Sequence, residues 1–329
     1  MEILPILVLA VSFVVLLFLG VPVAFTLLAS TTLTLLIFLP LEPALATVAQ
    51  RSVSGLDSFV LLAIPLFILA GQFMNTPGIA GRLIALARNL VGFLPGGLAF
   101  VNIAAAMLFG AISGSAGAAA SAVGGAMTGQ MTKAGYDRAF CAATNLTAST
   151  TGLVIPPSNG LIVYSLAAGG LSIGSLFLAG YIPGLIVGGA LMTVAFVYAR
   201  KRGYPTEERV GAGTAVRSFF TALPSLFLLF LVIGGIVAGW FTPTEAAGIA
   251  VLYSAALSVA VYRDIPLSQI GRVLLQSART TSIVLLLIAA SVAMSWLMAY
   301  LHLPQTISSL LLGISENPVV VLIMINLIL

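Results

Sequence analysis

Residues 144–159 combine the densest run of polar side chains with two consecutive prolines, in a chain that is otherwise apolar. Pro156 and Pro157 lack the N–H groups that a helix needs, so the carbonyls four residues earlier lose their partners. In hydrocarbon each unpaired backbone group costs roughly several kcal/mol, so another group must bind these carbonyls. Hydroxyls beside free carbonyls form a hard, oxygen-rich environment that suits sodium. The alternative is a purely structural proline kink, in which neighbouring Ser and Thr side chains bond to the free carbonyls. We favour a sodium and substrate site because polar residues flank the break on both sides; its candidate residues here are Asn145, Ser149, Thr150, Thr151, Gly152, Pro156, Pro157, Ser158 and Asn159.

A second candidate is Ser113-Gly114-Ser115, near the middle of a Gly/Ala/Ser-rich stretch at about 98–132. If this stretch enters the membrane and returns, the chain must turn there, which is tolerated only inside protein or beside a cavity. Half-helix ends at such a turn present carbonyls and N–H groups to ions and anionic substrates. Tight helix packing through small residues four apart is the competing interpretation. The pairs that fit it are Gly110 with Gly114 and Gly125 with Gly129. We predict that sodium is held by Ser113, Ser115, Thr150, Thr151 and Gly152.

Composition excludes a water-soluble globular protein, because 60% of the 329 residues are hydrophobic and only 7% are charged. A single cysteine, Cys141, and a single histidine, His302, exclude a disulfide framework and a Cys- or His-rich metal centre. The chain has neither a Gly-x-Ser-x-Gly elbow nor a Walker A loop, so we expect no enzyme and no ATP-driven pump. The basic residues are spread between apolar spans, which indicates membrane orientation and no nucleic-acid partner.

The apolar segments predict an all-α polytopic protein embedded in a lipid bilayer, because each is about the length that spans hydrocarbon. Residues 98–132 are expected to form a re-entrant hairpin, and residues 136–168 a broken helix. The polar linkers 41–56, 77–92 and 264–280 suit short helices at the interface. The regular spans are 3–20, 22–39, 57–75, 173–198, 218–240, 243–262 and 281–301.

Basic residues then assign the two sides of the membrane. With a hairpin and one broken crossing, twelve of the thirteen Lys and Arg fall on one side, and only Arg51 falls opposite. The positive-inside rule makes that side cytoplasmic and the N-terminus periplasmic, in a bacterial inner membrane. The twelve are Arg82, Arg88, Lys133, Arg138, Arg200, Lys201, Arg202, Arg209, Arg217, Arg263, Arg272 and Arg279.

The later part of the chain repeats the earlier part faintly: Pro77 after one span recurs as Pro304, and Asn102 recurs as Asn326. An odd number of crossings separates the copies, so the second is inverted, as in secondary transporters. We expect a first repeat over 1–200, a basic cytoplasmic loop over 201–217 and a second repeat over 218–329. The second copy ends at Leu329 before its hairpin tip, so we expect a C-terminally incomplete fold that does not transport by itself.

Acidic side chains lie at span ends or in linkers, so no carboxylate sits at mid-membrane depth to relay protons. Coupling to a cation held by neutral oxygens fits this distribution better. Glu245 follows Thr244 at a helix start, where the helix dipole favours a negative charge. The other carboxylates are Glu2, Glu42, Asp57, Asp137, Glu207, Glu208, Asp264 and Glu316.

The chain resembles the large membrane subunit, often called DctM, of tripartite ATP-independent periplasmic (TRAP) transporters. The matching stretches are 61–71, 108–116, 135–137, 155–158, 172–180 with 183–184, and 242–247. The chain departs from the family at Asn159, where an aliphatic residue is commoner, and at 127–131, where the family often has a proline.

This resemblance implies a sodium-driven importer that works by an elevator movement, with sites at the hairpin tips and broken helices. It also implies an organic acid substrate such as a dicarboxylate or sialic acid, a periplasmic binding protein that delivers it, and a small four-helix membrane subunit. Two alternatives stay open. One is a sodium- or proton-coupled carboxylate transporter without a binding protein; the other is a membrane scaffold or channel subunit.

Overall fold

The computed structural model describes residues 3–168, 171–207 and 211–328. Glu2, Glu208, Arg209 and Leu329, named above, lie outside these residues. The described residues form helices joined by turns and contain no β-strand, which confirms the all-α fold class. The helices divide into two compact units, residues 1–58 with 282–329 and residues 59–281.

The first unit contains the N-terminal helices and the C-terminal ones. Its core joins Leu9 and Leu35 to Val48, Ala293 and Leu297. The last two helices, α15 and α16, are bent by 120° at the break between them. The elements are α1 (Ile3–Phe18), α2 (Val23–Leu35), α3 (Leu41–Ser54), the later part of α14 (Ile270–Tyr300), α15 (Leu303–Ile314) and α16 (Pro318–Ile328).

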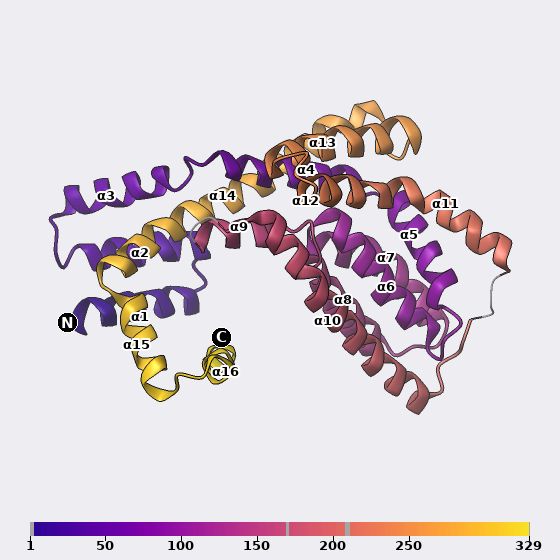
Figure 1. Cartoon of the computed structure of the whole chain (residues 1–329), viewed down its shortest axis with the longest axis horizontal. Coiled ribbons are helices and arrows are strands. Elements are labelled where there is room, and N and C mark those ends of the chain that lie inside the picture. The colour runs from indigo at the N-terminus through magenta and orange to yellow at the C-terminus, as the bar shows by residue number, and fades with distance from the viewer. Residues whose placement is uncertain (1–2, 169–170, 208–210, 329) are drawn as a thin grey trace. The chain divides into compact units, whose positions relative to one another are not determined.

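The second unit is built around α6 (Gly97–Ser113), a helix that is buried almost all round, as expected for a central apolar helix. Figure 1 shows α6 among α7, α8 and α10, with α5 beside them. The other elements are η1 (Phe59–Leu62), α4 (Ala63–Met74), α5 (Pro77–Val91), α7 (Ala116–Lys133), α8 (Arg138–Val154), α9 (Asn159–Ala167), α10 (Ile173–Arg202), α11 (Ala212–Leu229), η2 (Phe230–Gly234), α12 (Gly235–Val237), α13 (Pro243–Ala255), η3 (Ala256–Val261), η4 (Leu267–Gln269) and the first part of α14.

Four helices are long and apolar enough to cross a membrane, and the number rises to six if each bent pair counts as one span. They are Ile173–Arg202, Gly213–Val237, Pro243–Val261 and Leu267–Tyr300. Helices α1 and α2 are apolar but shorter, at 16 and 13 residues. The predicted apolar spans are therefore confirmed as helices, with shifted ends.

Residues 97–133 form two helices that return on themselves, and the re-entrant course of this hairpin in the membrane stays a prediction. Gly114 ends α6 and Ser115 caps α7. At the far end, the Asn102 amide near the start of α6 lies 3.8 Å from the Met131 sulfur near the end of α7. The two helices therefore run side by side in opposite directions.

The turn that joins α7 to α8 is fixed to the end of α10 by aromatic stacking. Tyr136 stacks on Tyr204 with ring centroids 4.2 Å apart, and the Asp137 carboxylate caps α8 by accepting from the Ala139 N–H at 2.7 Å. Burial raises the pKa of the Tyr136 hydroxyl to about 12. This turn is therefore held in place by packing, and it fixes the position at which α8 begins.

One expectation is wrong. Residues 264–280 do not form a separate interfacial helix, because α14 continues from Ile270 to Tyr300 without a break. The alternative interpretation, tight packing through small residues, also fails at Gly125 and Gly129 within the described structure, since a Cβ added at either position would have no atom within 4 Å. By contrast, the capping box of Thr242 and Glu245 confirms Glu245 as a first-turn charge.

Candidate functional site

The hairpin tip lies directly against the proline break. A Cβ added at Gly114 would lie 2.8 Å from the Pro157 carbonyl oxygen, and one at Gly152 would lie 3.6 Å from the Ser115 carbonyl oxygen. The two segments that the sequence singled out, more than thirty residues apart, are thus neighbours in space.

Gly110 and Gly152 make this contact possible. A Cβ on Gly110 would lie 2.4 Å from the Gly152 Cα, so α6 and α8 touch backbone to backbone one turn before the tip. The two interpretations of the sequence are therefore compatible: Gly110 packs against α8, and Gly114 lies where the hairpin tip meets the proline break. The small residue brings the helices together, and the turn beyond it meets the break.

Three glycines on neighbouring helices allow close packing against the hairpin tip and the break. Gly71 of α4 leaves room for the Ser113 carbonyl, which would lie 2.7 Å from a Cβ at that position. Gly180 and Gly184 of α10 likewise face the Val154 carbonyl and the Ile155 side chain. Sequence reasoning quoted these glycines within motifs but gave them no role. Glycine destabilises a helix, so its presence inside these apolar helices was the sequence signal that could have indicated a close contact.

The hairpin tip itself is an αL turn. Gly114 has φ 61°, and Ser115 is extended, so its Oγ accepts from the Ala118 N–H at 3.3 Å. The Ser113 hydroxyl donates to the Ser115 carbonyl at 3.4 Å and is nearly buried. Helix α7 therefore begins at the tip, with its first N–H groups at a helix N-terminus suited to anions.

The break occupies residues 155–158, between α8 and α9, with a cis Pro156–Pro157 bond. Helix α8 continues through Gly152 to Val154. The Ser158 hydroxyl donates to the Leu153 carbonyl at 2.6 Å, which satisfies the carbonyl that Pro157 leaves unpaired. At Leu153 the structure therefore agrees with the alternative interpretation, a proline kink whose free carbonyl is bonded by a nearby hydroxyl. Pro156 leaves the Gly152 carbonyl without its usual helical donor at the contact with the hairpin tip.

The hydroxyls before the break donate to their own helix. Thr151 is fully buried and donates to the Ala148 carbonyl at 2.6 Å, while Ser149 donates to Leu146 at 2.8 Å. Thr150 is exposed and donates to Thr147 at 2.7 Å. A donating hydroxyl keeps its lone pairs, so each of these oxygens can still ligate a cation.

Asn145 and Asn159, the two asparagines among the candidate residues, differ in their hydrogen bonds. The Asn145 amide donates to the Ala120 carbonyl at 3.1 Å and packs on Gly124, so this residue joins α7 to α8 nearly three turns before the break. Asn159 begins α9 beside Ser158, and its buried Oδ1 has no hydrogen-bond partner among the described residues. Asn159 thus supplies a buried, uncommitted oxygen next to the break.

Among the described residues, no group of three or more His, Cys, Asp or Glu could hold a metal ion. The hairpin and the broken helix carry Asp137 alone of the carboxylates, at the turn between them. The site therefore offers hydroxyl, amide and carbonyl oxygens with helix N-termini.

Comparison with known proteins gives the family. The family described as "Tripartite ATP-independent periplasmic transporter, DctM component" matches residues 10–329. The chain is 52% identical over 325 residues to the uncharacterized protein YgiK of Salmonella typhimurium, with 99% of this chain and 74% of YgiK covered.

Several relatives have named substrates, including the following two. The chain is 39% identical over 300 residues to the C4-dicarboxylate TRAP transporter large permease protein DctM of Pseudomonas aeruginosa, with 91% of this chain and 70% of that protein covered. It is 38% identical over 314 residues to the sialic acid TRAP transporter large permease protein SiaM of Vibrio cholerae, with 95% and 73% covered. These matches confirm the resemblance found from the sequence motifs: the chain is a multi-pass inner-membrane protein that belongs to the family of DctM components, the large permeases of TRAP transporters.

Proposed function

We propose that this chain is the large subunit of a secondary active importer that moves an organic acid into the cell with a sodium gradient. A periplasmic binding protein delivers the acid, and a small four-helix membrane subunit accompanies the chain. The N-terminus lies in the periplasm, and transport proceeds by an elevator movement of the part that carries the hairpin.

The observation that carries the proposal is the contact of the hairpin tip with the proline break at Gly114 and Pro157. Two interruptions of apolar helices are costly in a membrane unless they are buried in protein or line a water-filled cavity. The Pro157 carbonyl and Gly152 lie at this contact, and Thr151 and Asn159 adjoin these segments in the sequence with a buried hydroxyl and an amide oxygen that is unpaired among the described residues. Half-helix ends of this kind bind coupling ions and anionic substrates in secondary transporters.

The groups of the candidate site suit coupling to sodium better than coupling to protons. A proton relay needs a titratable group within the membrane. The hairpin helices and both halves of the broken helix contain no Asp, Glu or His. Neutral oxygens remain, and these are ligands for a hard monovalent cation.

The substrate class rests on the relatives' names. They include C4-dicarboxylate, sialic acid and 2,3-diketo-L-gulonate, which all carry a carboxylate. The N-termini of α7 at Ser115 and of α9 at Asn159 offer N–H groups and positive dipole ends for such an anion.

The test is uptake into proteoliposomes, with the chain in the full length that its gene encodes, its small subunit and its cognate receptor. We expect uptake of an organic acid that needs both sodium and the receptor. Uptake without the receptor would identify a stand-alone transporter. Failure of folded protein to take up any acid would favour a scaffold or channel.

Thr151 allows a sharper test with a matched control. Thr151→Val removes one buried hydroxyl with little change of shape, and we expect the sodium concentration for half-maximal uptake to rise by about tenfold, as for a lost bond to a charged group. Thr147→Val removes an exposed hydroxyl that bonds to its own helix in the same way, at 2.7 Å. Equal effects of the two substitutions would remove Thr151 from the sodium site.

A further inference from the structure

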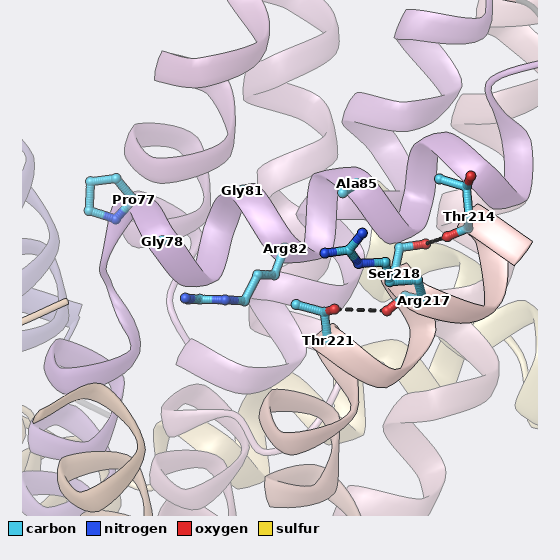
Figure 2. Close-up of a pocket in the computed structure, with 9 residues that line it drawn as sticks. All are labelled: Pro77, Gly78, Gly81, Arg82, Ala85, Thr214, Arg217, Ser218 and Thr221. Atoms are coloured by element: carbon cyan, nitrogen blue, oxygen red, sulfur yellow. Dashed lines mark hydrogen bonds between the residues drawn. The ribbon is translucent and has the colours of Figure 1, made fainter. Parts of the chain in front are cut away.

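A groove lies between α5 and α11 in the second unit, and the proposed transport site does not use it. It has a volume of about 530 Å³ and is open on one side. None of its lining residues belongs to the hairpin tip or the proline break. Figure 2 shows these residues, which are Pro77, Gly78, Gly81, Arg82 and Ala85 of α5, and Thr214, Arg217, Ser218 and Thr221 of α11.

The groove carries one net positive charge. Arg82 is neutralised, because its guanidinium lies 2.9 Å from the Asp264 carboxylate and stacks on the Tyr262 ring at 3.6 Å. Among the residues that the structure describes, Arg217 has no carboxylate within 4 Å. Figure 2 shows Arg217 reaching from α11 toward α5, on the side of Gly81 and Ala85.

Small residues and hydroxyls form the rest of the lining. Gly81 faces open space, since a Cβ there would meet no atom within 4 Å. The hydroxyls of Ser218 and Thr221 bond to carbonyls of their own helix at 3.0 Å and 2.7 Å. Their protons can rotate from these carbonyls to donate to an oxyanion beside Arg217, and the Ser218 Oγ also accepts from the Asn89 amide.

A second cavity of about 460 Å³ extends the groove along α5. It shares Gly81, Ala85, Thr214 and Ser218 with the first cavity and continues to Arg88. Arg88 is already paired, with Glu207 at 3.0 Å. The uncompensated charge of the whole groove is therefore that of Arg217.

The groove lies at the polar end of an apolar helix. Residues Gly213–Val237 form a candidate membrane span, and the groove uses the first turns of that span. Phe219 and Phe220 follow directly and are 45% and 63% exposed. The groove therefore lies at the end of a candidate span, the depth at which lipid headgroups meet acyl chains.

We propose that this groove binds the headgroup of an anionic membrane phospholipid. Its phosphate pairs with the Arg217 guanidinium in the space beside Gly81, and an acyl chain lies along the exposed Phe220. Basic pockets between membrane helices bind acidic lipid headgroups in this manner. The inference goes beyond the proposed transport function and does not depend on it.

The test is native mass spectrometry of the detergent-purified chain, delipidated and then titrated with phosphatidylglycerol or with zwitterionic phosphatidylcholine. We expect phosphatidylglycerol to be retained preferentially. Arg217→Gln should weaken its retention about fivefold, the effect of one basic residue near an anionic surface, and Arg217→Lys should restore most of it. Gly81→Leu should also weaken retention, because it fills the groove without changing any charge.

Arg138→Gln is the matched control, because Arg138 is exposed at the start of α8 and outside the groove. Equal retention in Arg138→Gln, Arg217→Gln and Gly81→Leu would overturn the proposal. Competition by millimolar inorganic phosphate with full displacement of the lipid would show a site for soluble phosphate. Capture of the co-expressed small subunit by a cross-linker on Gly81→Cys, without specific lipid binding, would show a protein interface.

Discussion

Gly114 carries two separate constraints at the most important turn of the chain. Its φ of 61° lies in the left-handed region, which side chains disfavour, and a Cβ would meet the Pro157 carbonyl oxygen at 2.8 Å. One constraint is local and the other comes from the tertiary contact with the break. The residue is therefore fixed by both the turn and the candidate site.

We predict that Gly114→Ala destabilises the protein by about 1–3 kcal/mol, the usual cost of strain at such a position. The contact with Pro157 should open, so sodium-dependent uptake should fall as well. Thermal unfolding in detergent measures the first effect. Gly125→Ala is the control, because Gly125 lies in α7 with open space around it. That control should gain about 0.5–1 kcal/mol from helix propensity. Equal stability of the two variants would show that the tip is not held against the break.

Sequence reasoning identified the oxygen-bearing residues of the site but not how each oxygen is used. Ser, Thr and Pro types in one segment predicted unpaired carbonyls, and the carbonyl of Leu153 is instead satisfied by Ser158. A hydroxyl reaches a carbonyl five residues back only because the chain turns at the prolines. That geometry depends on local backbone angles, which residue types do not specify.

At the scale of elements, the start of α13 was predictable from the sequence. Helix α13 begins with a capping box, in which the Thr242 Oγ1 accepts from the Glu245 N–H at 3.3 Å and the Glu245 carboxylate accepts from the Thr242 N–H at 2.8 Å. The Thr-x-x-Glu spacing alone signals this arrangement. Sequence reasoning found the charge of Glu245 but not its reciprocal bond.

We predict that Thr242→Ala lowers the unfolding free energy by about 1 kcal/mol, the typical cost of a lost N-cap. Amide exchange at the first turn of α13 should rise, because the Glu245 N–H loses its acceptor. Thr242→Ser keeps a hydroxyl and should match the unchanged protein. Equally slow exchange in Thr242→Ala and Thr242→Ser would mean that tertiary packing, and not the cap, holds this turn.

Element ends inside polar stretches were harder to predict. Arg272 and Arg279 suggested a linker before the last span, yet α14 runs through both. A change of polarity does not stop a helix; proline or a terminal glycine does. The nearest proline, Pro266, stands before the helix, and Gly271 lies in its first turn. The close contact of Gly110 with Gly152 was equally hidden, because it depends on which helices pair.

At the scale of the whole molecule, the return of the hairpin decides how every later loop is oriented. Helices α6 and α7 run in opposite directions, so we expect residues before Gly97 and after Lys133 to lie at the same membrane surface. The sidedness from basic residues requires this return. A single crossing would move Lys133 and Arg138 to the side of Arg51 and break the positive-inside pattern.

Thiol labelling of intact cells tests that topology. In a Cys141→Ala background, single cysteines replace Gln50, Leu90 and Lys133, which are all exposed in the described structure. We expect a membrane-impermeant reagent to label Gln50→Cys from the periplasm, and to label Leu90→Cys and Lys133→Cys only after the cells are permeabilised. The critical comparison is between the last two, because the hairpin separates them in sequence. Labelling of Lys133→Cys together with Gln50→Cys in intact cells would show that residues 97–133 cross the membrane, and the predicted cytoplasmic side of all the later loops would then be reversed.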